Sequence, residues 1–374
     1  MPLYVGLMSG TSLDGLDAVL ARIDDTPAGL ALTVHAHHHR AFDDDLRAEL
    51  LALNRRGDDE LHRAAVATRR LVALAADTVL QLLADAGVCA AEVRAIGSHG
   101  QTVRHRPPAA GVAVPYTIQL DDGAWLAEHT GIDVVCDFRR RDLAAGGQGA
   151  PLVPAFHAAC FARPGQAVAV LNSGGIANLT LLGAGGEVAG FDCGPGNVLL
   201  DLWCERHTGR RYDEDGRWAA GGRVDDALLA ALLAEPYFAL PPPKTTGRDL
   251  FHAEWLDARL QPFKTLPAAD VQATLVALTA AAASDALRRH APATERLIVC
   301  GGGARNHALI TALAARSPGV EVVTSAAVGL DPMHVEAAAF AWLAHAHLER
   351  QPGNRCEVTG ARGPRVLGAL YPAR

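Results

Sequence analysis

Several features that mark common functional classes are scarce in this sequence. Lysine occurs only at Lys244 and Lys264, and neither lies in a Gly-x4-Gly-Lys-Ser/Thr pattern, which excludes a P-loop NTPase. The seven cysteines include no Cys-x-x-Cys pair, and this fits reduced thiols better than a disulfide framework. No apolar run reaches the ~18 residues of a membrane span, and no basic and apolar leader precedes the first strand. We therefore expect a cytoplasmic protein that is not embedded in a membrane.

The composition bounds the architecture and the partners. A length of 374 residues suggests two domains, and 49% apolar with only 5% aromatic residues indicates a core of alanine, leucine and valine. The net charge of −7 argues against a general affinity for nucleic acid or for anionic membranes.

The stretch Met8-Ser-Gly-Thr-Ser-Leu-Asp-Gly-Leu-Asp17 separates two predicted short strands and is too small and polar to pack in a core. Gly10 and Gly15 permit positive φ and close approach of a ligand to the backbone. Backbone N–H groups and hydroxyls in such a turn can surround phosphate oxygens. Asp14 and Asp17 could hold Mg²⁺ through water or orient a substrate. A plain hairpin with a Ser/Gly turn is the alternative.

The same layout returns later in the chain. Residues 167–171 and 179–182 read as strands, and Asn172-Ser-Gly-Gly-Ile-Ala-Asn178 is the polar turn between them. Two such hairpins, one opening each half of the chain, are expected for a cleft that closes on the phosphates of a nucleotide. The duplication favours an actin-like fold.

Three further polar segments follow predicted strands. Ser98-His-Gly-Gln-Thr102 follows the strand 93–97, at the edge where α/β sheets bind ligands, although a structural turn explains it as well. Asp192 lies beside the turn Gly194-Pro-Gly196, either as an Asx-type cap or as a functional carboxylate. Gly301-Gly-Gly-Ala-Arg-Asn306 is a strand-to-helix turn on which a base or ribose can lie. The adjacent residues His37, His38 and His39 predict an exposed strand end rather than a metal site.

Elements between these segments are also predicted from pattern. Residues 43–53 and 59–86 read as helices, with Gly87 ending the second one. The alanine-rich helix after Glu336 is expected to cross another helix closely, and residues 366–370 to return to the first domain as a strand.

Several of these strings together resemble the anhydro-N-acetylmuramic acid kinases, which belong to the sugar kinase, Hsp70 and actin superfamily. The similar strings number at least six and include those at residues 8–17, 98–102, 190–197 and 241–248, and the resemblance covers nearly the whole chain. It implies an α/β, two-lobed actin-like (RNase H-like) fold with the nucleotide in the interlobe cleft. We place the first lobe at residues 1–131 plus 358–374 and the second at 132–357.

The resemblance also implies roles for individual residues. Asp192 is the expected catalytic base, Glu336 is placed near the sugar or water, and Cys193 stands where the family has threonine, which puts a hydrogen bond in doubt. The residues expected to bind ATP are Gly10, Thr11, Ser12, Leu13, Asp14, Gly15, Leu16, Asp17, Asn172, Gly174, Gly175, Gly301, Gly302, Gly303 and Asn306. Those expected to bind the sugar are His99, Gln101, Arg139 and Asn197. No residue is assigned as a direct metal ligand.

The family's reaction uses ATP and Mg²⁺ and acts on 1,6-anhydro-N-acetylmuramic acid from peptidoglycan turnover. Water opens the anhydro bridge at C1, and O6 takes the γ-phosphoryl group, giving N-acetylmuramic acid 6-phosphate. The resemblance further implies a homodimer. Two other readings stay open: a sugar kinase of the same fold that acts on an ordinary hydroxyl, and a nucleotide-gated protein of the Hsp70 or actin kind.

Overall fold

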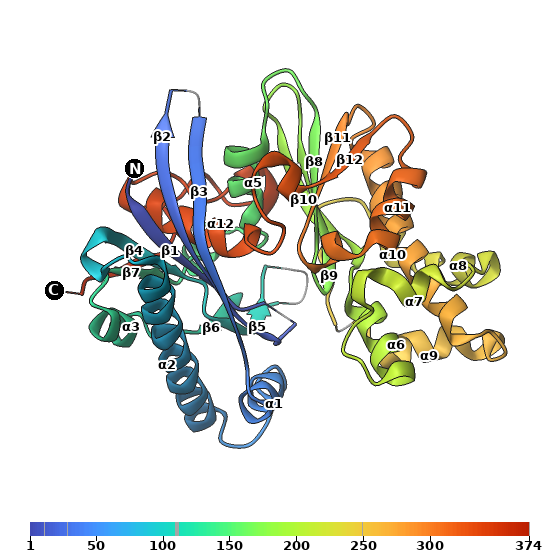
Figure 1. The fold of residues 1–374 in the computed structure, drawn as a ribbon, viewed down its shortest axis with the longest axis horizontal. Coiled ribbons are helices and arrows are strands. Elements are labelled where there is room, and N and C mark those ends of the chain that lie inside the picture. The colour runs from blue at the N-terminus through green and yellow to red at the C-terminus, as the bar shows by residue number, and fades with distance from the viewer. Residues whose placement is uncertain (11, 28, 109–111, 249, 374) are drawn as a thin grey trace. The chain divides into compact units, whose positions relative to one another are not determined.

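The structure is a computed structural model that describes residues 1–10, 12–27, 29–108, 112–248 and 250–373. The chain forms two compact units, Met1–Cys160 with His334–Arg374, and Phe161–Met333. Each unit is built around its own β-sheet, and Figure 1 shows these sheets and the helices that cover them.

The sheet of the first unit has six strands in the order β13-β7-β4-β1-β2-β3. Strands β1, β2 and β3 form an antiparallel meander, β4 and β7 continue it in parallel with β1, and β13 closes the edge antiparallel to β7. The central strand β1 is apolar almost throughout, because both of its faces are covered. The bounds are β1 Leu3–Met8, β2 Gly15–Thr26, β3 Gly29–Ala41, β4 Val93–Ser98, β7 Val134–Cys136 and β13 Ala369–Tyr371.

The sheet of the second unit repeats this topology, with the order β10-β9-β8-β11-β12. Its first three strands are again an antiparallel meander, and β11 and β12 run parallel to β8. A meander of three strands continued by two parallel strands is the pattern of the RNase H-like fold, and two such units in one chain confirm the predicted actin-like class. The bounds are β8 Val168–Ser173, β9 Ile176–Leu182, β10 Val188–Pro195, β11 Arg296–Cys300 and β12 Glu321–Thr324.

Helices cover the sheet of the first unit, and two further strands of this unit form a separate hairpin. The alanine-rich helix α12 makes its close crossing with the sheet, where the prediction had a second helix: a Cβ added at Gly6 or Gly97 would overlap a carbonyl oxygen of α12. Small residues on both sides therefore permit this close helix–sheet contact. The bounds are α1 Asp44–Ala52, α2 Glu60–Ala86, β5 Gln101–Arg106, β6 Tyr116–Leu120, α3 Gly123–Thr130, α4 Arg140–Ala144, α5 Val153–Phe161, α12 Val335–Leu348 and α13 Cys356–Thr359.

The second unit carries most of its helices between β10 and β11. Helix α10 is buried over nearly its whole length and forms the centre of an apolar core with residues of β8, β9 and β11. The bounds are α6 Val198–Thr208, α7 Arg217–Ala220, α8 Asp226–Leu233, α9 Ala253–Leu260, α10 Ala268–His290 and α11 His307–Arg316. Short 3-10 helices lie at Ala90–Glu92, Glu214–Gly216, Pro236–Ala239, Gln261–Phe263, Gly302–Arg305 and Ser325–Val328.

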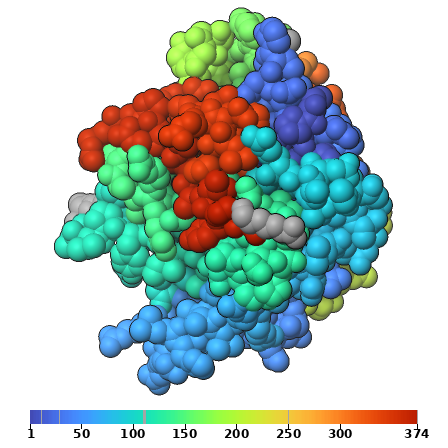
Figure 2. Space-filling model, turned by 90° about the vertical axis from the view of Figure 1, so that its left-hand side faces the viewer, coloured from blue at the N-terminus to red at the C-terminus, as the bar shows by residue number. Residues whose placement is uncertain are grey.

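The borders of the compact units differ from the predicted lobe borders. The prediction placed the first crossing near residue 132, but β7 pairs in parallel with β4 and so belongs to the first sheet. Helix α12 likewise packs on β1 and β4, which places the second border at residues 333 and 334 rather than near 357. Figure 2 shows the C-terminal segment (red) packed against the green segment that contains residues near 145, in agreement with the bond from Arg362 N–H to the Ala145 carbonyl.

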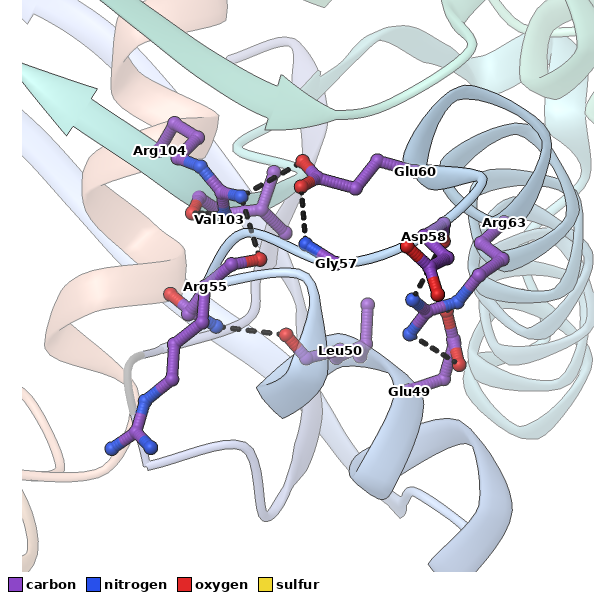
Figure 3. Close-up of polar contacts among 10 residues, drawn as sticks. Glu49, Leu50, Arg55, Gly57, Asp58, Glu60, Arg63, Val103 and Arg104 are labelled. Carbon is purple, nitrogen blue, oxygen red and sulfur yellow. Dashed lines mark hydrogen bonds and ion pairs between the residues drawn. The ribbon is translucent and has the colours of Figure 1, made fainter.

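A polar network ties strand β5 to the connection between α1 and α2 (Figure 3). The Arg104 guanidinium donates to the Arg55 carbonyl at 2.7 Å and to the Glu60 carboxylate at 2.9 Å. Glu60 in turn accepts the Gly57 N–H at 2.6 Å, and Arg63 is paired with Glu49. These bonds fix the strand that begins at Gln101. Among the described residues, no helix is long and apolar enough to cross a membrane.

Candidate active site

The loop between β1 and β2 has the open backbone expected of a phosphate-binding turn. A Cβ added at Gly10 would meet nothing closer than the Ser12 hydroxyl oxygen, at 3.7 Å, so a ligand can approach the main chain there. Ser12 donates to the carboxylate of the exposed Asp14 at 2.6 Å. The positive φ that we expected at glycine occurs instead at Leu13, where φ is 55° and the side chain is buried. Thr11 lies outside the described residues.

The last three residues of the predicted loop belong to strand β2. Gly15 is required by packing, because a Cβ there would lie 2.5 Å from the Arg40 carbonyl oxygen on β3. Leu16 is part of the apolar core of the first unit. The glycine of this loop that remains open to a ligand is therefore Gly10.

Asp17 is held by two histidines of the neighbouring strand. Its carboxylate is 2.8 Å from His37 Nε2 and 3.1 Å from His39 Nδ1. Burial raises the pKa of Asp17, but the two histidine hydrogen bonds outweigh burial and leave it below the ordinary value. The bond to Asp17 conversely raises the pKa of His39. The sequence predicted that this histidine run is an exposed strand end, but two of its side chains are hydrogen-bonded to Asp17.

His99, Gln101 and Arg139, which the resemblance assigns to the sugar, lie close together in the first unit. The guanidinium of Arg139 is 2.8 Å from His99 Nε2, and His99 Nδ1 is 3.2 Å from the Ser9 carbonyl. Arg139 can only donate, so Nε2 accepts and Nδ1 carries the proton. Burial and the charge of Arg139 lower the pKa of His99 to about 3, which keeps it neutral. Ser9 donates its hydroxyl to Gln101, so Gln101 is tied to the loop between β1 and β2.

Arg139 is fixed from two sides. Its Nη1 donates to the Gly149 carbonyl at 2.8 Å. The fully buried Asp142 accepts the Gly149 N–H at 2.7 Å and also binds Asn354 and Thr359. Burial lowers the pKa of Arg139 to about 10, against opposing effects of Glu336 and Asp142. Glu336, in the first turn of α12, is therefore close enough to act electrostatically on Arg139.

The glycine segments of the second unit converge on one place. Gly174 and Gly175 leave open space where a side chain would begin. Gly301 has a φ of 75°, and a Cβ there would lie 2.5 Å from the Asn172 amide oxygen, so this turn lies against the end of β8. The buried Asn172 Oδ1 and Ser173 Oγ have no hydrogen-bond partner among the described residues. Buried polar atoms are normally hydrogen-bonded, which makes these two atoms candidates to bind a polar ligand.

Two predicted binding residues of this unit also have structural roles. Asn197 donates its side-chain amide to the Ser173 carbonyl at 3.0 Å, and it lies beside Gly302. Asn306 is the N-cap of α11, since its side chain accepts the Leu309 N–H at 3.0 Å. Gly303 is packed against the Ser173 side chain. These contacts bring the residue 172–175 turn, the start of α6 and the residue 301–303 turn together.

Asp192 lies on β10, where a β-bulge interrupts the pairing with β9. Its Oδ2 accepts the Thr246 N–H at 3.0 Å, and burial raises its pKa to about 6 although that hydrogen bond lowers it. The neighbouring Cys193 donates its thiol to the Ala177 carbonyl at 3.3 Å, so the thiol makes the contact that was in doubt. A carboxylate with a pKa near neutrality is suited to general base catalysis.

Sequence reasoning missed the residues that support Asp192 and Arg139. Thr246 and Lys244 belong to a string that we noted but could not connect to Asp192, because 54 residues separate Thr246 from it. No sequence pattern marked Asp142 as a supporting residue, apart from its position before a glycine-rich segment. Within the second unit, the turns at residues 174–175 and 301–303 offer open backbone suited to phosphate or nucleotide, and Asp192 is a carboxylate suited to proton abstraction.

The comparisons with known proteins agree with one family. A model of the family "Anhydro-N-acetylmuramic acid kinase" matches residues 2–373. A protein of that name from Variovorax paradoxus is 58% identical, over 99% of both chains, and one from Bordetella petrii is 60% identical, over 99% of this chain and 96% of the relative. A solved structure, an activator of 2-hydroxyisocaproyl-CoA dehydratase from Clostridium difficile, is similar with a TM-score of 0.49 and 11% identity, over 93% of this chain and 96% of that one.

Proposed function

The chain belongs to the anhydro-N-acetylmuramic acid kinase family, and from this we propose that it phosphorylates O6 of 1,6-anhydro-N-acetylmuramic acid with ATP while water opens the anhydro ring. The product is N-acetylmuramic acid 6-phosphate. The single observation that carries the proposal is Asp192, a carboxylate desolvated enough to have a pKa of about 6 yet held in place by one main-chain N–H.

Asp192 acts as the general base in this proposal. Water donates a proton to the Asp192 carboxylate as its oxygen bonds to C1 of the sugar. The bond from C1 to O6 breaks, O6 keeps the electron pair and takes the γ-phosphoryl group, and ADP departs. The reaction resembles inverting glycoside hydrolysis, with phosphoryl transfer in place of the general acid. Coupling the two steps is favourable because the transferring phosphoryl group neutralises the charge that develops on O6.

We assign ATP binding to the open glycine turns of each unit. In the first unit, Gly10 and Ser12 offer main-chain and hydroxyl donors to phosphate oxygens. In the second unit, the turn at Gly174 and Gly175 would bind phosphate, and the turn at residues 301–303 the adenosine. The unpartnered Asn172 Oδ1 and Ser173 Oγ support this assignment, since a bound polar group would satisfy them.

The loop between β1 and β2 supplies only part of the ligands that a magnesium ion needs. The described residues contain no group of three or more acidic, histidine or cysteine side chains that could hold a metal. Mg²⁺ in phosphoryl transfer is usually bound by one or two carboxylates together with waters and phosphate oxygens. We therefore propose Asp14 as its contact through water, because the Asp17 carboxylate is already occupied by His37 and His39. The bound ion would supply charge neutralisation at the phosphates.

The sugar is assigned to Arg139, Glu336 and Asn197. Arg139 has five N–H donors, and its bonds to His99 and Gly149 leave hydrogens that can bind the lactyl carboxylate of the substrate. Both ring nitrogens of His99 have partners, and Gln101 is bound to Ser9. We therefore propose that His99 and Gln101 act by orienting Arg139 and the phosphate loop. Glu336 would orient the sugar or the attacking water.

The setting of the reaction is part of the proposal. The substrate class arises in peptidoglycan turnover, so the enzyme would serve cell-wall recycling in the cytoplasm, where ATP is available. A homodimer is proposed on the family resemblance alone.

Purified protein with ATP, Mg²⁺ and 1,6-anhydro-N-acetylmuramic acid, in water labelled with ¹⁸O, tests the proposal. We expect N-acetylmuramic acid 6-phosphate with one label on the anomeric carbon and none in phosphate, formed first as a single anomer. Label in inorganic phosphate, or ring opening without ATP, would contradict the coupled reaction. Phosphorylation of free N-acetylmuramic acid but not of the anhydro sugar would instead indicate a kinase for an ordinary hydroxyl.

A further inference from the structure

A loop of the second unit, residues 241–248, wraps around Asp192 and contacts it at main-chain level. The Asp192 N–H donates to the Lys244 carbonyl at 3.2 Å, and the Thr246 N–H donates to the Asp192 carboxylate at 3.0 Å. On the preceding 3-10 helix, the Tyr237 hydroxyl donates to the Asp192 carbonyl at 2.7 Å. The position of the carboxylate is therefore determined by this loop as well as by β10.

Lys244 holds the loop in place from within the unit. Its side chain is buried, with Nζ donating to the carbonyl of Tyr237 at 3.2 Å and to that of Phe238 at 3.4 Å, and it lies 4.7 Å from the centre of the Tyr237 ring. Burial lowers the pKa of this ammonium group. A buried cation with these bonds restricts the main chain two residues before Thr246, so the amide of Thr246 is presented in one orientation.

The hydroxyl of Thr246 is unusual in this setting. Its oxygen is buried and has no hydrogen-bond partner among the described residues. Buried hydroxyls are normally hydrogen-bonded, either to protein or to water. Because a threonine hydroxyl lies only about 3 Å from the amide nitrogen of its own residue, this group lies within the reach of one water molecule from the Asp192 carboxylate that the amide binds. The neighbouring Thr245 is exposed, so its side chain does not share this buried position.

We propose that Thr246 is a further catalytic residue, whose hydroxyl holds the attacking water together with Asp192. The inference rests on the proposed role of Asp192 as base. The water donates one hydrogen to the Asp192 carboxylate and the other to the Thr246 oxygen, which leaves a lone pair of the water oxygen directed at C1. As the bond to C1 forms, the first proton passes to Asp192, the second stays on the new anomeric hydroxyl, and O6 leaves with its electron pair to the γ-phosphoryl group.

The role is distinct from that of the main chain at the same residue. The Thr246 N–H orients the base and lowers its pKa, and every residue except proline would keep that hydrogen bond. Of these two polar groups of Thr246, the N–H and the hydroxyl, only the hydroxyl accepts a hydrogen bond from the water. Replacing the side chain therefore separates the two effects, and Thr246→Val removes the oxygen while keeping nearly the same shape.

The test compares Thr246→Val, Thr246→Ser and the matched control Thr245→Val in the full-length protein, with the coupled assay, calorimetric ATP binding and thermal melts. We expect Thr246→Val to lower kcat by about ten- to a hundred-fold, with ATP affinity within about two-fold. Thr246→Ser should recover most of the loss, and Thr245→Val should match the unmodified protein. The pH at which kcat falls on the acid side should be the same in Thr246→Val, because the hydrogen bond from the N–H of residue 246 to the Asp192 carboxylate remains.

Three results would overturn the inference. These are kcat within two-fold in a folded Thr246→Val, a Thr246→Ser as defective as Thr246→Val, or an acid limb displaced to higher pH, which would mean that the side chain acts only by placing Asp192. Asp192→Asn distinguishes this failure from failure of the proposed function. If Asp192→Asn is inactive and Thr246→Val is active, only the role of Thr246 fails; if Asp192→Asn is active, the assignment of the base fails first.

Discussion

Asp17 and Asp192 are the same residue type on strands beside glycine turns, one in each unit, and their surroundings push the pKa in opposite directions. Asp17 accepts hydrogen bonds from two histidines, which keep its pKa below the ordinary value despite burial. Asp192 is partly buried and accepts one main-chain N–H, and desolvation raises its pKa to about 6. Asp17 is therefore suited to a structural role, and Asp192 is suited to proton transfer. The partners of a carboxylate, rather than its position beside a glycine turn, therefore decide its chemistry.

Asp192→Asn should give the largest effect. We expect kcat to fall by about two to four orders of magnitude, with ATP affinity within a few-fold, because the amide keeps the size of the side chain but cannot take a proton. Single-turnover assays and calorimetry measure the two quantities. Turnover near that of the unmodified protein in the folded variant would show that the two aspartates do not differ as we describe.

Gly10→Val should weaken ATP binding by about ten-fold or more, because a β-branched side chain would block the approach to the phosphate turn. The fold should tolerate it, since the nearest atom to the added Cβ is 3.7 Å away. Gly15→Val is the matched control with the opposite outcome: it should lower the melting temperature sharply, as its Cβ would lie 2.5 Å from the Arg40 carbonyl oxygen. Equal nucleotide affinity in Gly10→Val and the unmodified protein would remove this turn from the site.

The raised pKa of Asp192 predicts opposite pH effects on activity and on stability. Turnover should fall as the pH drops below about 6, because the base becomes protonated. A carboxyl whose pKa is raised by folding stabilises most below its unfolded pKa, and that contribution is lost as the pH rises through 6. At pH 8 the neutral Asp192→Asn should therefore be more stable than the unmodified protein, by roughly 1–3 kcal/mol. Denaturant unfolding at pH 5 and 8 checks this; a variant less stable at both values would contradict the desolvation of Asp192.

Asp17→Asn should have the smallest effect and the opposite sign. Losing charge-assisted bonds to His37 and His39 should cost about 1–2 kcal/mol near pH 6. The raised pKa of His39 gives stability that is present below its unfolded pKa of about 6.5 and is lost as the pH rises through the higher folded value. The cost should therefore shrink between pH 6 and pH 8. His38→Gln, which leaves both partners of Asp17 in place, serves as the control. A cost that is constant across this range would show that the histidine charge is unimportant.

The predictable parts of the molecule were those that a short stretch of chain carries by itself. The turn composition at residues 8–17 and 172–178 predicted both hairpins, and the helical spacing after Asp59 predicted α2 with Gly87 at its left-handed end. The residues proposed as the site were found from such strings. Their partners were not, because Thr246, Asp142 and the histidines of β3 reach the site through pairings distant in the sequence.

The sequence by itself determined the two strand–turn–strand segments, since turn chemistry and periodicity act over a few residues. Its longer strings carried the resemblance to the family that the family model and the relatives then showed, and the role of Asp192 as base stays a prediction. The tertiary structure alone decided which carboxylate is neutralised by partners and which is desolvated. It also decided where the units divide, because β7 joins the first sheet by pairing with β4 and α12 packs on that sheet through Gly6 and Gly97. Strand order and close packing select these contacts between segments far apart in the chain, and no local pattern encodes the selection.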